Sequence, residues 1–194
     1  MNNLFESFNA DGIKEFVSVN RRLVKFLVRL FTLILLWKVM FHFIWHNPSW
    51  LQAYNEFALL IISYVLEGTG FLLELIGYEV FINHAERLVG IAGTTGIEVG
   101  EPCIGINTIA FFCALILSDK GRIRVKLWFI PLGALIICLL NLIRISVLAM
   151  IIQINPVIWE LNHKFVFSLF IFGMLLFFWM IWLKKYSLIR GEGA

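Results

Sequence analysis

Three side chains able to do chemistry stand far apart in this sequence: a cysteine, an arginine and a histidine. Cys103 follows Pro102 where a polar segment meets a hydrophobic one. Proline suits the first position of a helix, so the pattern places Cys103 in a helix's first turn. The free N–H groups and positive end of a helix favour a thiolate, the nucleophilic form of cysteine. Cys103 is therefore a candidate nucleophile; the alternative is a small apolar residue that only packs.

The other two side chains would supply a cation and a proton carrier. Arg144 lies in a long apolar segment, where an arginine costs roughly 2.5–3.5 kcal/mol on insertion scales and is usually paired or functional. Its guanidinium could stabilise an oxyanion, and the structural alternative is an ion pair with Glu67, Glu74 or Glu101. His163 could exchange protons with a thiol because histidine titrates near neutral pH. Its alternative is a capping or interfacial role.

Two asparagines and one glutamate are candidate supporting residues. Asn141 precedes Arg144 by three positions, so both would lie on one helix face and Asn141 could orient the guanidinium. Asn162 stands next to His163 and could hold its imidazole or cap a helix. Glu101 completes the set by its place two residues before the cysteine.

The composition points to a membrane protein with a single domain over residues 1–194. Of 194 residues, 60% are hydrophobic, and the mean hydropathy is +0.87, values typical of chains with membrane spans. The net charge of +3 comes without a basic cluster on a soluble face, so no nucleic-acid partner is expected. Cys113 and Cys138 lie mid-segment and are interpreted as core packing. No Cys-x-x-Cys pair occurs, and no metal or cofactor is expected.

Hydrophobic segments predict an all-α integral membrane fold, a bundle of about four to six membrane helices over residues 26–183. The segments are 26–45, 56–78, 104–117, 127–152 and 164–183. An amphipathic, basic segment at 1–25 and a tail at 184–194 are predicted to be cytoplasmic. The second segment is broken by Glu67-Gly-Thr-Gly70, so it could be re-entrant or interfacial instead of crossing fully.

A β-hairpin is predicted outside the membrane within residues 79–102, which carry too many charges to cross it. Residues 88–92 and 97–99 flank the turn Gly93-Thr-Thr-Gly96, a pattern typical of hairpins. One or both of these glycines should need a positive φ. The hairpin would lead the chain to Cys103.

Charge bias sets the expected topology. The basic loop 119–126 and the tail should be cytoplasmic, which puts residues 79–103 and 155–163 outside. Arg144 comes 17 residues after Leu127, about 25 Å along a helix and so near the outer edge of a core about 30 Å thick. Basic residues at 21–29 favour a cytoplasmic N-terminus. Two crossings before Cys103 would contradict that, unless segment 56–78 does not cross.

Three motifs together resemble the exosortase/archaeosortase family, in particular its short single-domain members. They are Gly-Glu-Pro-Cys-Ile-Gly-Ile-Asn at 100–107, Leu-Asn-Leu-Ile-Arg at 140–144 and Leu-Asn-His-Lys-Phe-Val-Phe at 161–167. The resemblance covers roughly residues 73–183. The commoner family pattern is Ala-Cys-Ser-Gly, whereas this chain has Pro-Cys-Ile-Gly, so Ile104 cannot make a serine's hydrogen bond. The departure bears on the target signal more than on the reaction.

The resemblance implies a multi-pass transpeptidase of the bacterial inner membrane with its active site on the extracytoplasmic side. It assigns Cys103 as nucleophile, Arg144 as oxyanion and substrate stabiliser, and His163 as acid/base. It implies as partners the C-terminal sorting signal of secreted proteins, cut through an acyl-thioester, a surface glycan or lipid acceptor, and the membrane lipid. Two alternatives stay open: a thiol protease that only hydrolyses, and a non-enzymatic transporter or scaffold with a structural Arg–Glu pair.

Overall fold

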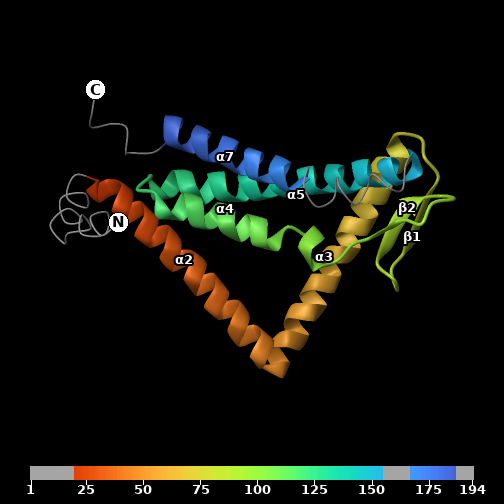
Figure 1. Cartoon of the computed structure of the whole chain (residues 1–194), viewed down its shortest axis with the longest axis horizontal. Coiled ribbons are helices and arrows are strands. Elements are labelled where there is room, and N and C mark those ends of the chain that lie inside the picture. The colour runs from red at the N-terminus through yellow and green to blue at the C-terminus, as the bar shows by residue number, and fades with distance from the viewer. Residues whose placement is uncertain (1–19, 155–166, 187–194) are drawn as a thin grey trace, which may run out of the picture.

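The computed structural model describes residues 20–154 and 167–186, and these form five long helices with a small sheet (Figure 1). The elements in chain order are α2 (Arg21–His46), α3 (Pro48–Leu75), β1 (Val80–Asn83), β2 (Leu88–Ile91), β3 (Ile97–Glu98), the 3-10 turn η1 (Glu101–Cys103), α4 (Ile106–Ser118), α5 (Ile123–Ile154) and α7 (Phe167–Lys185). Helices α4, α5 and α7 run along the long axis of the molecule, and the sheet lies at one end of it.

By length and composition, α3 and α5 are apolar enough to cross a membrane, and α4 is a shorter apolar helix. The predicted mostly helical class is therefore confirmed, with two membrane-capable helices among the described residues. The number of crossings stays a prediction.

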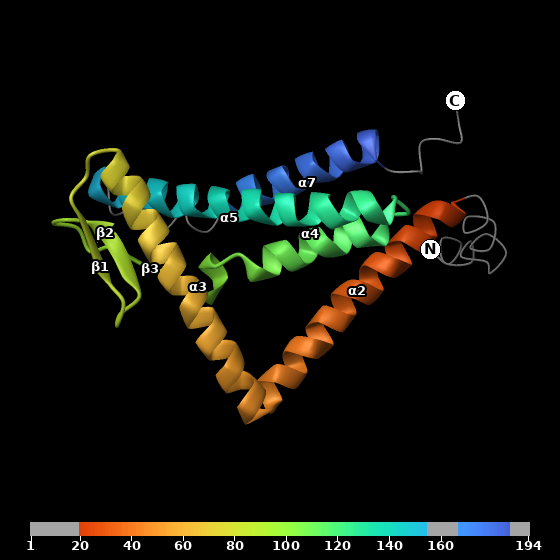
Figure 2. The same cartoon turned by 180° about the vertical axis from the view of Figure 1, so that it is seen from behind.

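The first two helices meet in a sharp corner (Figure 2). Helix α2 ends at His46, Asn47 is extended with φ −116° and ψ 112°, and α3 begins at Pro48. A proline at the first position restarts a helix without losing a hydrogen bond. The connection between α2 and α3 is therefore the single extended residue Asn47.

The break predicted at residues 67–70 is wrong, because α3 continues through them. The two glycines there serve close packing instead. A Cβ at Gly70 would come within 2.8 Å of the Ile82 side chain, and one at Gly68 within 3.1 Å of the Leu142 side chain. Helix α3 can therefore approach β1 on one side and α5 on another.

The predicted hairpin is confirmed, and the structure adds a third strand. Strands β2 and β3 pair antiparallel with Val89 opposite Ile97, and β1 pairs with β2 with Val80 opposite Ile91. The fold is thus not purely helical, and β1 was not predicted. In the turn, Gly93 has φ +85° and Gly96 has φ +71°, as expected for a turn that needs positive φ.

Two buried clusters hold these layers together. One lies between α3, the sheet, η1 and α5, and includes the fully buried Leu73 and Val89. The other lies between α4, α5 and α7, around Phe112 and Trp182. Cys103 belongs to the first cluster, so the position of the candidate nucleophile depends on the four elements that form it.

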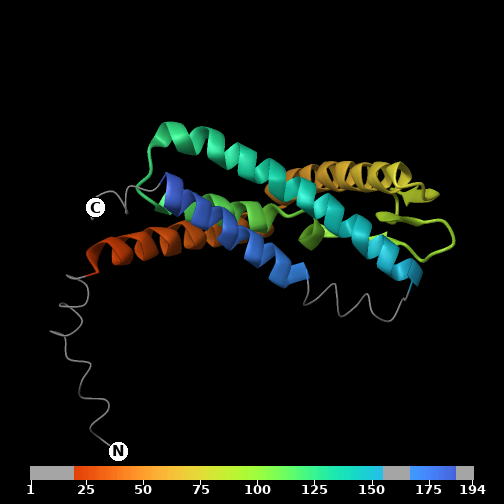
Figure 3. The same cartoon turned by 90° about the horizontal axis from the view of Figure 1, so that it is seen from above.

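Exposed basic side chains gather at the end of the molecule opposite the sheet. Helix α2 begins there, the α4–α5 connection turns there, and α7 ends there (Figures 1 and 3). The exposed residues are Arg21, Arg22, Lys25, Arg29, Lys120, Arg122, Arg124, Lys184 and Lys185. The three basic segments identified in the sequence therefore share one end.

Candidate active site around Cys103

Cys103 lies in the short turn η1 and not in the first turn of α4, as was predicted from the proline. The Cys103 N–H donates to the Gly100 carbonyl at 2.9 Å, and Pro102 does open this 3-10 turn. Gly105 then takes φ +75°, which ends η1 and caps α4. A residue with a Cβ would pay roughly 1–2 kcal/mol in that left-handed conformation. The glycine separates the cysteine turn from the long helix.

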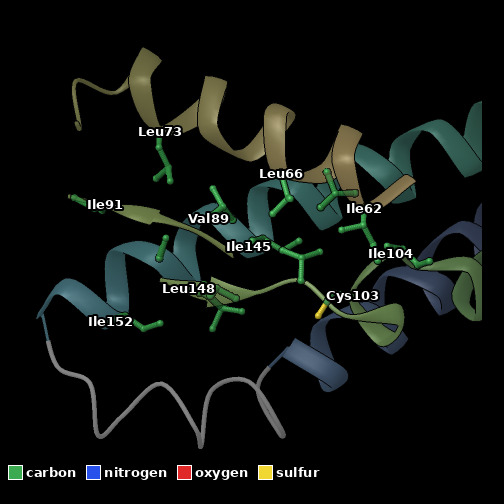
Figure 4. Close-up of a cluster of buried hydrophobic side chains, with 14 of the residues drawn as sticks. Ile62, Leu66, Leu73, Val89, Ile91, Cys103, Ile104, Ile145, Leu148 and Ile152 are labelled. Carbon is green, nitrogen blue, oxygen red and sulfur yellow. The ribbon is translucent and has the colours of Figure 1, made fainter. Parts of the chain in front are cut away.

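The thiol lies at the edge of the first core cluster (Figure 4). Cys103 is 6% exposed and packs in the cluster that contains Ile104, Ile145 and Leu148. In Figure 4 its sulfur points out of the cluster, toward the side where α7 begins. Cys138, by contrast, is exposed on α5, so the prediction that it packs in the core is wrong.

Asn141 joins α5 directly to the cysteine turn. Its side-chain amide donates a short hydrogen bond to the Cys103 carbonyl, and both residues are buried. The sequence had suggested that Asn141 orients Arg144; the contact recorded here is with the Cys103 backbone. Arg144 follows three positions later on the same α5 face and is half-buried. Two of the predicted site residues are thus in contact, and a third lies one turn away.

The corner formed by α2 and α3 supports the cysteine motif from its other side. The Tyr54 hydroxyl donates to the Glu101 carboxylate at 3.4 Å, and the Trp37 indole N–H donates to the Asn107 side chain at 3.2 Å. Phe41 fills the corner with its ring edge against Tyr54, 5.4 Å between centroids. Sequence analysis missed this support. The one sequence feature that could have pointed to it is the pair Trp37 and Phe41, four positions apart on α2, and such a pair by itself indicates no function.

Two of the three glutamates proposed as structural partners of Arg144, Glu67 and Glu101, bond to other residues. Glu67 pairs with His84, 3.0 Å between carboxylate oxygen and ring nitrogen Nε2, and the other nitrogen lies 3.5 Å from the Ser63 hydroxyl. Glu101 accepts from Tyr54. Both carboxylates therefore tie α3 to the 79–103 segment.

His163 and Asn162 lie outside the described residues. Helix α7 begins at Phe167, four positions after the histidine, a distance of at most about 14 Å for an extended chain. The first turn of α7 and η1 lie at the same level of the bundle in Figures 1 and 3.

The comparison with protein families decides what kind of protein this geometry belongs to. The chain matches the family model described as Transmembrane exosortase (Exosortase_EpsH) over residues 23–183. It belongs to the transmembrane exosortase family. No curated protein and no solved structure gives a match. The matched range runs from the first turn of α2 to near the end of α7 and includes the three motifs described above.

Asn141→Ala should impair an exosortase-family site more than it impairs folding. The substitution leaves a buried carbonyl without its donor, which costs about 1–3 kcal/mol, and frees the cysteine turn from the helix that carries Arg144. We expect processing of a sorting substrate to fall by an order of magnitude or more at unchanged expression.

The matched control is Ser146→Ala, on the same helix. Ser146 is also buried, but its hydroxyl bonds only the backbone of α5, at the Leu142 carbonyl. Equal processing by the two variants, measured by immunoblot, would show that the Asn141 contact has no special role.

Proposed function

We propose that this protein is a cysteine transpeptidase that cleaves the C-terminal sorting signal of secreted proteins. The observation that carries the proposal is the hydrogen bond from Asn141 to the Cys103 carbonyl, because it fixes the candidate nucleophile to the helix face of Arg144. Membership of the exosortase family supports a transpeptidase-like role. The buried setting of Cys103 supports a role in a defined site.

In the proposed reaction, the Cys103 thiolate attacks the carbonyl carbon of the scissile peptide bond. Arg144 donates hydrogen bonds to the tetrahedral oxyanion, as fixed donors do in acyl transfer. The carbon–nitrogen bond breaks, and His163 gives the leaving amine the proton it had taken from the thiol. An acyl-thioester on Cys103 remains. A hydroxyl or amine of an acceptor then attacks it and releases the thiolate.

The substrate and acceptor classes follow from the family resemblance. The signal would be a short motif followed by a membrane helix and a basic end, and the acceptor a surface glycan or lipid. The Glu-Pro-Cys-Ile-Gly sequence lacks the serine of the commoner pattern, so the motif read here should differ from that of the commoner members.

The proposed location is the bacterial inner membrane, with Cys103 near the extracytoplasmic surface. Its support is the gathering of exposed Lys and Arg at the end of the molecule away from the sheet, since basic segments are retained in the cytoplasm. The acyl-thioester would then form outside, where secreted substrates and surface acceptors meet.

Mass analysis of the processed substrate tests the reaction. Membranes containing the enzyme and a tagged substrate are incubated with and without hydroxylamine, which captures thioesters. We expect a hydroxamate at the new C-terminus with hydroxylamine and a covalently attached acceptor without it. A free carboxylate in cells would instead establish hydrolysis. Unprocessed substrate, or a hydroxamate still formed by Cys103→Ala, would overturn the proposal.

A further inference from the structure

We propose that α3 does not cross the membrane but lies along its outer surface, with lipid of the outer leaflet covering its exposed apolar stripe. That the surface is the outer one rests on the orientation given under the proposed function. The position of α3 along a surface follows from the structure independently. It makes α3 the element that sets the depth of Cys103.

The start of α2 and the end of α3 lie at opposite ends of the molecule, which is incompatible with both helices crossing the membrane. Two helices that cross a membrane in succession return the chain to the face from which it started. Here Arg21 begins α2 at the basic end, whereas α3 leads into the sheet at the opposite end (Figure 1). The pair therefore makes one net passage, so only one of the two helices crosses.

The helix that crosses in this arrangement is α2, although by length and composition alone α3 qualifies as a span and α2 does not. It runs alongside α4, whereas α3 is steeply inclined to α4 and α7 (Figures 1 and 2). With 26 residues, α2 is about 39 Å long, enough for a core of about 30 Å. Trp45 and Trp50 flank the corner after it and are both exposed, as is typical of a membrane–water interface.

Contacts along α3 place its whole length beside a segment that cannot enter a membrane. Near its start Tyr54 bonds Glu101, further on Glu67 bonds His84, and near its end Gly70 faces Ile82. All three partners belong to the charged segment 79–103. Glu67 and His84 are 61% and 53% exposed, so an ionisable pair on α3 would face hydrocarbon if the helix crossed, at a cost of several kcal/mol.

The exposed surface of α3 has the two stripes of an interfacial helix. Most of the exposed large apolar residues recur at helical spacing along one stripe, namely Trp50, Phe57, Leu60, Tyr64, Phe71 and Leu75, and Leu59 is exposed on another face. The exposed polar residues fall on a neighbouring stripe and are Gln52, Glu56, Glu67 and Glu74. Lipid is the occupant that fits the first stripe, because α2, which joins α3 at Asn47, also exposes mainly large apolar side chains, while water solvates the second.

With α3 at the surface, the passages that remain are α2, α5, α7 and α4, whose 13 residues cover about 20 Å of a core about 30 Å thick. Four crossings return the chain to its starting face, so the N-terminal cluster, the α4–α5 connection and the end of α7 are all on one side. This agrees with the gathering of basic residues there. Through Tyr54 and Glu101, α3 then holds the cysteine turn at the depth where a membrane-anchored substrate emerges.

Cysteine accessibility tests the position of α3 without needing activity. In full-length protein with Cys103, Cys113 and Cys138 replaced by alanine, single cysteines are introduced as Glu56→Cys and Glu74→Cys, toward the two ends of α3. Spheroplasts are treated with a membrane-impermeant maleimide before and after permeabilisation. Arg124→Cys and Gln153→Cys, both at exposed positions toward the ends of α5, are the matched controls for a helix that crosses.

We expect both α3 cysteines to react before permeabilisation, together with Gln153→Cys, whereas Arg124→Cys should react only afterwards. Within α3, Glu67→Cys should react several-fold faster than Leu60→Cys, since lipid covers the apolar stripe. Labelling of the two α3 positions from opposite sides, or equal rates at 60 and 67, would overturn the inference. Protection of both α3 positions with Arg124→Cys accessible would keep α3 on one surface and refute only the orientation of the proposed function.

Discussion

Cys103→Ala should abolish processing of the sorting substrate, a loss of roughly 10³-fold or more, because no nucleophile remains to form the acyl-thioester. The side chain is 6% exposed within a core cluster, and alanine removes little volume there, so the fold should persist. The measurement is an immunoblot of substrate in cells, with the amount of each enzyme variant checked in the membrane fraction.

The other two cysteines provide the controls for this prediction. Cys113→Ala and Cys138→Ala should process normally, because neither residue belongs to the cluster around Cys103. Wild-type processing by Cys103→Ala, or a loss confined to one of the two controls, would contradict the assignment.

A double substitution tests whether Cys103 and His163 act as one catalytic unit. Residues of one catalytic unit are strongly non-additive, so Cys103→Ala with His163→Ala should be no worse than Cys103→Ala alone. His163→Ala by itself should recover partly at higher pH, where more of the thiol ionises without a base. Independent, multiplying losses would mean that the histidine acts elsewhere.

The turn between β2 and β3 was predictable from sequence because its physics is local. Two glycines three positions apart, between short apolar runs, leave few conformations other than a turn with positive φ. Pro48 offers a local signal of the same kind, since α3 starts there, yet the second hydrophobic segment was predicted only from residue 56. Where neighbouring residues decide the conformation, the pattern was sufficient.

The cysteine turn shows where a local pattern is not sufficient. Pro102 correctly predicted a helical turn at Cys103. The sequence did not predict that this turn is separate from α4, because Gly105 between them looks like any small residue near a helix start. The Asn141 amide nitrogen lies 4.0 Å from the place of a Cβ at Gly105 and donates to the Cys103 carbonyl. A contact between positions 103 and 141 has no signature in sequence spacing.

The predicted break in α3 was wrong for a related reason. Gly68 and Gly70 weaken a helix in isolation, so a break was expected. Their role became visible only with Leu142 and Ile82 in place, side chains that come too close for a larger residue. Tertiary packing therefore decided a feature that local propensity decides wrongly. Likewise Trp37 and Tyr54 became supports of the cysteine motif only through the corner that brings them to it.

Arg144→Lys should lower processing by about 10²–10³-fold, the loss typical of removing one oxyanion donor. Lysine keeps the positive charge but loses the planar fork, which could serve an oxyanion and a neighbouring group at once. The half-buried position on α5, one turn after Asn141, restricts where a replacement ammonium could point. Processing and membrane insertion are measured together, with Arg124→Lys at the exposed basic end as the matched control.

This substitution also separates catalysis from a purely structural role. In a scaffold, Arg144 would only need to pair with a carboxylate, and a lysine supplies that charge, so Arg144→Lys would be tolerated. In a transpeptidase the geometry of the donors matters as much as their charge, because the oxyanion forms at a fixed place above the Cys103 acyl carbon. Full processing by Arg144→Lys would therefore exclude an oxyanion role for the guanidinium, whereas loss with normal insertion excludes the scaffold.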